Sequence, residues 1–178
     1  PPDCVTYVSV VKACGSVYAV DKGLENHLQI MKDGVEGNHI VGNALVTMYA
    51  KCGYLMEARS VFDETQKRDI LCWTAIITSY VQHGQEREAL YLFNSMIKEG
   101  ILPDKIAIVN ILSVCSSFVD FSECEEMFAC IHQCGLELDE AVGSAVLSMY
   151  GHFGKLKLCQ GLFERLPKTQ VSTWNAMI

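Results

Sequence analysis

The sequence predicts an all-α fold, a right-handed solenoid of antiparallel helical hairpins. Three observations predict it. Residues 39–49 (HIVGNALVTMY) recur as residues 140–150 (EAVGSAVLSMY), an offset of 101 residues. Apolar residues recur along the chain at the three- and four-residue spacings of amphipathic helices, and glycine or proline separates these segments. No segment alternates apolar and polar residues as a half-buried strand does. A fixed internal period with two helices in each unit is typical of solenoids.

The 101-residue period divides into three units, each with a first helix, a short turn, a second helix and a polar exit. The units span residues 4–38, 39–69 and 70–104, with lengths of 35, 31 and 35 residues. A second round covers residues 105–139 and 140–170, while residues 1–3 and 171–178 belong to incomplete units. One hairpin cannot bury both of its apolar faces, so neighbouring hairpins must stack. We therefore expect a single array, a window of a longer solenoid.

Each element has its own support in the sequence. The first helix of unit 4–38 contains residues 8–14, which recur at 109–115, and that of unit 70–104 contains residues 73–77, which recur at 174–178. Unit 70–104 shows both helices clearly. Its first helix carries Trp73, Ile76, Ile77, Tyr80 and Val81, and its second carries Ala89, Leu92, Phe93, Met96 and Ile97. Gly84 separates the two helices, and Gly100 with Pro103 ends the second.

Composition narrows the function classes. Half of the 178 residues are hydrophobic, which excludes intrinsic disorder, yet no apolar run is long enough to predict a membrane span. The net charge of −7 argues against a general nucleic-acid binder, because sequence-independent affinity needs clustered Lys and Arg. The nine cysteines lie within apolar helical patterns, so we expect mostly reduced, buried thiols. No targeting segment is recognisable at residues 1–3.

Specific motifs resemble the plant pentatricopeptide repeat (PPR) proteins of the PLS subclass, in which repeats of P, L and S type alternate. GNALVTMYAKCG at residues 42–53 with ARSVFD at 58–63 is similar to the S type. WTAIITSY at 73–80, EALYLF at 88–93 and GILPD at 100–104 are similar to the P type, and TYVSVVKAC at 6–14 to the L type. Tetratricopeptide repeats are the alternative, but their constant period of about 34 residues does not fit alternation of 35 and 31.

The resemblance orders the repeats as L (4–38), S (39–69), P (70–104), L (105–139), S (140–170) and the start of a P (171–178), after the tail of a P repeat at 1–3. It implies an array that binds single-stranded RNA, about one base per repeat. It further implies selection of sites for C-to-U editing or other RNA processing in mitochondria or chloroplasts.

In this family the fifth and last residues of a repeat read the edge of one base. Asn43 with Asp69 resembles the pair that prefers uracil, and Thr74 with Asp104 the pair that prefers guanine. Ser144 leans towards purine, but Gln170 departs from the usual Asp or Asn. The two L repeats pair Val8 with Asn38 and Val109 with Asp139, and valine cannot hydrogen-bond a base. The incomplete last repeat would contribute Asn175. A short polar fifth residue is expected to face the groove with its donor or acceptor available.

The second residue of a repeat is usually aliphatic in the family and sandwiches the bases. Ile40, Leu71 and Ile106 fit this role, whereas Ala141 is small and Ser172 is polar. The alternative is that aliphatic residues beside a helix start are ordinary core. Phosphate contacts are implied for a lysine late in the first helix, a position at which this chain has a lysine only at Lys51. We therefore expect weak RNA binding with a shallow salt dependence.

Other functions have weaker support. Cys124, Cys130, His132 and Cys134 lie within eleven residues but lack the paired CxxC spacing of structural zinc sites, so no metal is expected. No catalytic motif occurs, and the zinc deaminase signature is absent, so no enzyme, cofactor, small-molecule substrate or membrane role is predicted. The second hypothesis is a protein-interaction scaffold, because L repeats in this subclass are implied to recruit accessory editing factors.

Overall fold

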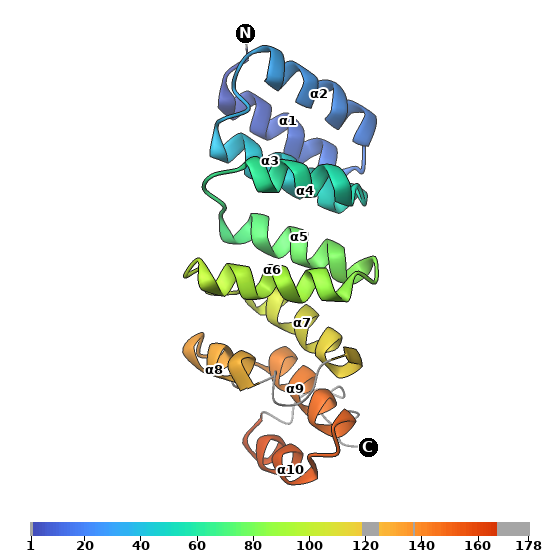
Figure 1. Cartoon of the computed structure of the whole chain (residues 1–178), viewed down its shortest axis with the longest axis vertical. Coiled ribbons are helices and arrows are strands. Elements are labelled where there is room, and N and C mark those ends of the chain that lie inside the picture. The colour runs from blue at the N-terminus through green and yellow to red at the C-terminus, as the bar shows by residue number, and fades with distance from the viewer. Residues whose placement is uncertain (1, 119–124, 137, 167–178) are drawn as a thin grey trace. The chain divides into compact units, whose positions relative to one another are not determined.

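The computed structural model describes residues 2–118, 125–136 and 138–166, and every regular element in these residues is an α-helix (Figure 1). The helices are α1 (Cys4–Ser16), α2 (Val20–Lys32), α3 (His39–Cys52), α4 (Leu55–Glu64), α5 (Ile70–Gln82), α6 (Glu86–Lys98), α7 (Lys105–Phe118), α8 (Glu125–Gln133), α9 (Glu140–His152) and α10 (Leu156–Arg165). The predicted all-α class is confirmed. None of the helices in the described ranges has the length and apolar character needed to span a membrane.

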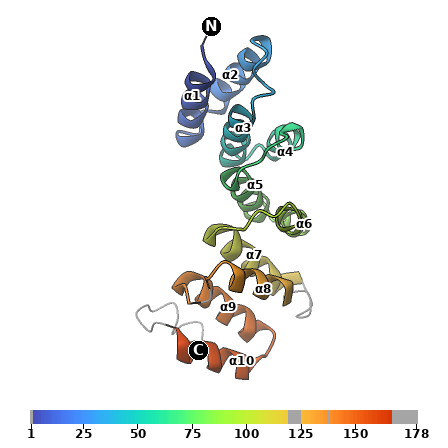
Figure 2. The same cartoon turned by 90° about the vertical axis from the view of Figure 1, so that its left-hand side faces the viewer.

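The helices form two compact units, Pro1–Leu92 and Phe93–Ile178, whose boundary falls within α6. In the first unit, α3 packs between α1 and α5, and each of α1 and α3 pairs with the helix that follows it (Figure 2). In the second unit, α7 packs on α9, and α9 pairs with α10. Within each unit, the first helix of a hairpin thus packs on the first helix of the next, as stacking of repeats requires.

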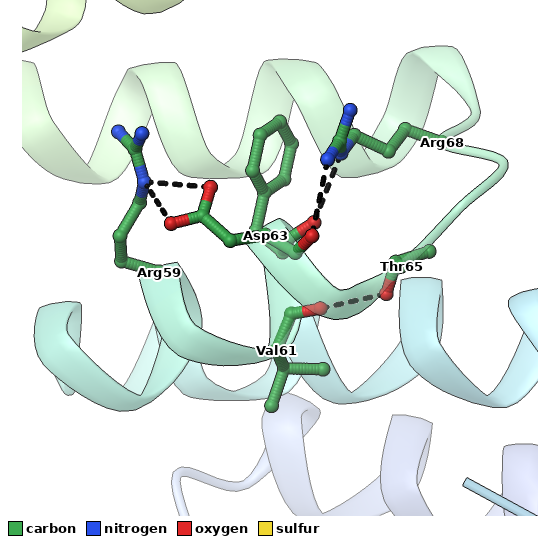
Figure 3. A network of polar contacts seen from close by, with 6 residues as sticks. Arg59, Val61, Asp63, Thr65 and Arg68 are labelled. Atoms are coloured by element: carbon green, nitrogen blue, oxygen red, sulfur yellow. Dashed lines mark hydrogen bonds and ion pairs between the residues drawn. The ribbon is translucent and has the colours of Figure 1, made fainter. Parts of the chain in front are cut away.

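The core of the first unit is densest around α5, where Trp73 is only 1% exposed. The Phe62 and Trp73 rings meet edge to face, with centroids 4.7 Å apart. The Arg68 guanidinium lies over Phe62, 4.5 Å from the ring centroid, and its Nε donates to the Phe62 carbonyl at 2.9 Å. This cluster fixes the exit from α4, since Thr65 Oγ1 also donates to the Val61 carbonyl and Arg59 pairs with Asp63 (Figure 3).

Gly42, the fourth residue of its repeat, allows the exit loop to rest directly on α3. A Cβ at Gly42 would lie 2.6 Å from Thr65 Oγ1. In the second round, Gly143 has the same relation to Leu166, whose side chain a Cβ would overlap. Both glycines are buried in helices, where glycine costs about 1 kcal/mol relative to alanine. We conclude that close loop packing accounts for glycine at this position.

A double-mutant cycle tests this packing. Gly42→Ala alone gains helix propensity but overpacks against Thr65, at a cost of about 1–3 kcal/mol. Thr65→Ala removes the hydrogen bond to the Val61 carbonyl. In the double variant the Cβ of residue 65 lies 3.5 Å from the Cβ added at residue 42, which is an ordinary van der Waals contact. We expect the double variant to be more stable than the sum of the single variants by about 1 kcal/mol or more in urea unfolding. Strictly additive effects would contradict the contact.

His27 and Tyr49 join the first two hairpins. His27 Nδ1 lies 2.8 Å from Tyr49 Oη, and the two rings meet edge to face. The corresponding pair in the second round, Phe128 and Tyr150, makes a ring contact with centroids 5.2 Å apart. Burial lowers the pKa of His27 against an opposing effect of the Glu64 charge. The contact is therefore made with neutral histidine at physiological pH.

This burial predicts a pH dependence of stability. Because the pKa of His27 is lower in the folded state, the unfolded chain binds more protons, and stability rises with pH below the unfolded value of about 6.5. Above that value the contribution of His27 is fully present. The second round has phenylalanine at this position. We therefore expect His27→Phe to reduce the change in the free energy of unfolding between pH 5 and 7. An unchanged slope would assign the pH dependence to other groups.

Candidate nucleic-acid interface

Among the described residues, the last residue of a repeat caps the first helix of the next one. Asp69 Oδ1 accepts a hydrogen bond from Cys72 N at 2.8 Å, and Asp104 Oδ1 accepts one from Ala107 N at 2.8 Å. Asn38 and Asp139 cap α3 and α9 in the same way. Asp and Asn are preferred at this position because their side chains satisfy free backbone N–H groups. This capping role was not predicted from the sequence, although an Asp or Asn directly before an apolar helix is its recognised signal.

The caps at Asn38 and Asp139, which end the repeats predicted to be of L type, have further partners. Asn38 Nδ2 lies 3.5 Å from Cys4 Sγ, and Asp139 Oδ2 accepts a hydrogen bond from Lys105 Nζ at 3.1 Å. Cys4 and Lys105 are the first residues of those repeats. Partial burial raises the pKa of the Asp139 carboxyl, but hydrogen bonds from Val142 and Ala141 backbone N–H groups and from Lys105 outweigh it, leaving the pKa lowered. Asp139 is thus an ionised and already paired carboxylate.

The fifth residues lie deeper than expected. Asn43 is 6% exposed and Thr74 is 7% exposed, whereas Val8, Val109 and Ser144 are half-buried. Asn43 Nδ2 donates to the Lys67 carbonyl at 3.4 Å, which places this amide beside the loop that ends in Asp69. Close stacking of successive first helices, with Gly42 admitting the exit loop, accounts for the burial. The expectation of an openly available polar group at these positions is therefore wrong for the unbound chain.

Two buried oxygen atoms at these positions have no hydrogen-bond partner among the described residues. They are Asn43 Oδ1 and Thr74 Oγ1, and Trp73 Nε1 shares this state. An unsatisfied buried polar atom costs about 1–3 kcal/mol and is rare in folded proteins. A polar ligand that hydrogen-bonds to these oxygen atoms would explain why the protein leaves them without partners. The two atoms belong to the two fifth residues with the clearest predicted base preference.

The second residues of three repeats are exposed aliphatic side chains at the starts of first helices. Within the first unit Ile40 is 54% exposed and Leu71 is 63% exposed, and Ile106 in the second unit is 57% exposed. Val5, which the sequence analysis did not single out, is 72% exposed at the same position of its repeat. The interpretation of these residues as ordinary core is wrong. A repeated exposed aliphatic side chain at one turn's distance from each fifth residue suits a flat apolar ligand surface.

The comparison with known proteins agrees with the repeat geometry. A PPR repeat family model matches residues 68–117, and a PPR repeat model matches residues 43–70. Residues 43–117 are thus similar to pentatricopeptide repeats. The matched ranges include both Asn43 and Thr74.

Relatives with the same repeats come from Arabidopsis thaliana. A chloroplastic pentatricopeptide repeat-containing protein is 34% identical over 177 residues, which cover 99% of this chain and 33% of the relative. A mitochondrial one is 35% identical over 176 residues, which cover 99% of this chain and 17% of the relative. The chain thus spans a third or less of the length of these curated relatives.

Solved structures share the fold. The pentatricopeptide repeat protein PPR10 from maize matches with a TM-score of 0.70 and 23% identity, over 100% of this chain and 26% of PPR10. PPR10 in complex with an 18-nt psaJ RNA element matches with a TM-score of 0.63 and 24% identity, over the same shares. At this identity the likeness establishes the hairpin fold of the PPR array.

The remaining candidate residues are placed as follows. Lys51 is exposed in the last turn of α3. Gln170 and Asn175, like Ser172 and Cys124, lie outside the residues that the structure describes. Ala141 is exposed. The exposed Lys51 side chain can reach an anionic ligand.

The cysteines of the PPR array behave as packing residues where they are described. Cys130 is buried, and burial raises the pKa of its thiol to about 11, while Cys134 Sγ lies 3.6 Å from the Pro103 carbonyl. Within the described ranges, no three His, Cys, Asp or Glu side chains are grouped closely enough to hold a metal ion. Burial also raises the pKa of Cys72 to about 12. The Cys72 and Cys130 thiols stay protonated at neutral pH and are poor nucleophiles.

Proposed function

We propose that this PPR array binds single-stranded RNA and reads about one base per repeat. The observation that carries the proposal is the state of Asn43 and Thr74. Each is a buried polar side chain with an oxygen atom that lacks a partner in the described structure, and each follows an exposed aliphatic residue by three positions. A base inserted between neighbouring exposed aliphatic side chains would bring polar edge atoms to those oxygens. The RNA complex of PPR10, a protein of the same fold, supports this mode.

The proposed reading pairs are Asn43 with Asp69 for uracil and Thr74 with Asp104 for guanine. Asp69 and Asp104 each use Oδ1 as a helix cap, so a base would be met by the remaining oxygen of the same rigid carboxylate. Ser144 gives a weak purine preference in the repeat that ends at Gln170. The RNA runs 5′ to 3′ along the array from the N- to the C-terminus.

The two L-type repeats are proposed not to read a base directly. Val8 and Val109 offer no donor or acceptor. The amide of Asn38 is directed to Cys4, and the carboxylate of Asp139 is paired with Lys105. The proposed register over residues 4–170 is therefore any base, uracil, guanine, any base, weak purine.

The proposal includes the PLS subclass, with L, S, P, L and S repeats at the boundaries given above, and a role in organellar RNA editing or other RNA processing. Chloroplastic and mitochondrial relatives support an organellar location. Lys51 is the proposed phosphate contact. With few cations available in a chain of net charge −7, binding relies on base contacts, and its salt dependence is shallow.

Exchange of two RNA bases tests the register. An RNA of the proposed register is compared with one in which the uracil and guanine are exchanged, using fluorescence anisotropy on the chain. Each mismatch is expected to cost about 1–3 kcal/mol, so affinity falls by about tenfold or more. Changing the two bases opposite Val8 and Val109 is the matched control and leaves affinity unaltered. Equal affinity for the exchanged RNA would refute the reading pairs.

A protein-interaction scaffold is the second candidate function, favoured by the absence of hydrogen-bonding groups at Val8 and Val109. The two functions separate on substitution of Asn43 and Thr74 by alanine. Loss of RNA selectivity with unchanged binding of accessory editing proteins supports RNA reading. Loss of protein binding with unchanged RNA selectivity supports the scaffold.

A further inference from the structure

Formal charge is divided unevenly between the helices of the first unit. Helices α1, α3 and α5 contain no Asp or Glu, but α1 contains Lys12 and α3 contains Lys51. The helical carboxylates of this unit all lie on second helices: Asp21 and Glu25 of α2, Glu57, Asp63 and Glu64 of α4, and Glu86 and Glu88 of α6. The net charge of −7 therefore arises outside these first helices, whose own charge is positive.

Lys12 lies on the same face of α1 as the exposed aliphatic residue Val5. Seven residues of an α-helix turn by about 700°, so the two side chains are within about 20° of each other and about 10 Å apart along the helix axis. Lys51 follows Ile40 by eleven residues, which also places it within about 20° of that exposed side chain. Each lysine thus shares a face with the second residue of its own repeat.

Helices α1 and α3 are in close contact between the two lysines. A Cβ at Gly15 would lie 3.1 Å from the Cα of Met48. Lys12 lies three residues before Gly15, and Lys51 lies three residues after Met48. Both lysines are therefore about one turn from the same helix contact, and one extended anionic ligand can reach both ammonium groups.

The Lys12 side chain is available to a ligand. It is exposed, and its ammonium group makes no ion pair or hydrogen bond with the described residues. The carboxylates nearest to it along the chain, Asp3 and Asp21, are each nine residues away. Asp3 Oδ1 accepts hydrogen bonds from N and Oγ1 of Thr6, and Asp21 lies beyond the hairpin turn on α2. The charge of Lys12 is therefore not neutralised within the described part of the chain.

We propose that Lys12 contacts the RNA backbone, at a phosphate on the 5′ side of the uracil that the second repeat is proposed to read. The first repeat, residues 4–38, then holds the RNA strand although Val8 reads no base in it. A lysine that neutralises a phosphate adds affinity without regard to sequence, because every nucleotide carries the same charge. This inference rests on the proposed RNA binding and on its 5′ to 3′ direction along the array.

The salt dependence of RNA affinity in Lys12→Gln tests the inference. Glutamine keeps the helix propensity and removes the charge at an exposed site. Fluorescence anisotropy over a series of salt concentrations should show a slope of log K against log salt that is smaller by about 0.7. The loss of affinity should be equal for the RNA of the proposed register and for the one with exchanged uracil and guanine. Lys32→Gln, which removes an exposed charge from α2, is the matched control and should leave the slope unchanged.

A shortened RNA that begins at the uracil, without a 5′ phosphate, locates the contact. It lacks the phosphate proposed for Lys12, so wild type and Lys12→Gln are expected to bind it with equal affinity. An unchanged slope in Lys12→Gln, an equal change in Lys32→Gln, or an equal loss of affinity for the shortened RNA would each overturn the inference.

Failure of the proposed function gives a different result. If the wild type binds both registers equally, the reading pairs are refuted, while a smaller slope in Lys12→Gln still supports the phosphate contact. If the wild type binds no RNA, the proposed function and this inference are overturned together.

Discussion

Trp73→Ala is expected to lower the free energy of unfolding of the first unit by about 3–5 kcal/mol. The indole is 1% exposed and meets the Phe62 ring at 4.7 Å, so its removal leaves a cavity between α4 and α5. Arg68 would also lose one of the two rings over which its guanidinium lies. Trp73 Nε1 has no hydrogen-bond partner in the described structure, so the expected loss comes from packing and not from a broken hydrogen bond.

Leu71→Ala is the matched control, two residues earlier in the same helix. Leu71 is 63% exposed, so its truncation is expected to change stability by less than about 0.5 kcal/mol. Urea unfolding followed by far-UV circular dichroism measures both variants. If Leu71 sandwiches a base, this variant binds RNA more weakly while folding normally. Similar stability losses in the two variants would contradict the packing of α5 described above.

Asn43→Thr is expected to change the preferred base of the second repeat from uracil to guanine. The substitution gives this repeat the pair Thr and Asp that Thr74 and Asp104 form in the next one. A good base contact contributes about 1–3 kcal/mol of discrimination, so the ratio of affinities for the two bases should change by at least about tenfold. Thr is smaller than Asn, so the buried site between α3 and the loop at Lys67 accommodates it.

Affinities for two RNAs that differ only at the base opposite the second repeat measure this change. Val109→Thr is the control, because it places the same side chain in a repeat whose last residue, Asp139, is already paired with Lys105. It should create little guanine preference. If Asn43→Thr lowers the affinity for both RNAs equally, the fifth residue supports the fold and does not select the base.

The sequence predicted the fold well because its signals are local and repeated. The 101-residue offset and the helical spacing of residues such as Trp73, Ile76 and Tyr80 predicted helices that the structure confirms. Glycine marked a real boundary at Gly84, which has a φ of 68° directly after α5. The same periodicity could not distinguish exposed from buried aliphatic residues at helix starts, because Ile40 and Leu71 differ from core residues only in how neighbouring hairpins stack.

The details of the candidate site depend on contacts between residues far apart in the chain. The burial of Asn43 follows from an exit loop 24 residues away, and the pairing of Asp139 with Lys105 joins residues 34 positions apart. Neither relation has a local sequence signal.

The last residue of a repeat caps the next helix and is also proposed to read a base, and this combination limits how base specificity can vary. Asp69 and Asp104 begin the next helix through the same carboxylate that is proposed to face a base. Substitution by a residue that cannot accept backbone N–H bonds would therefore weaken a neighbouring hairpin as well as alter recognition. The usable set at this position is confined to a few short oxygen-bearing side chains. Changes in the preferred RNA base must then come mainly from substitutions of the fifth residue, which does not cap a helix.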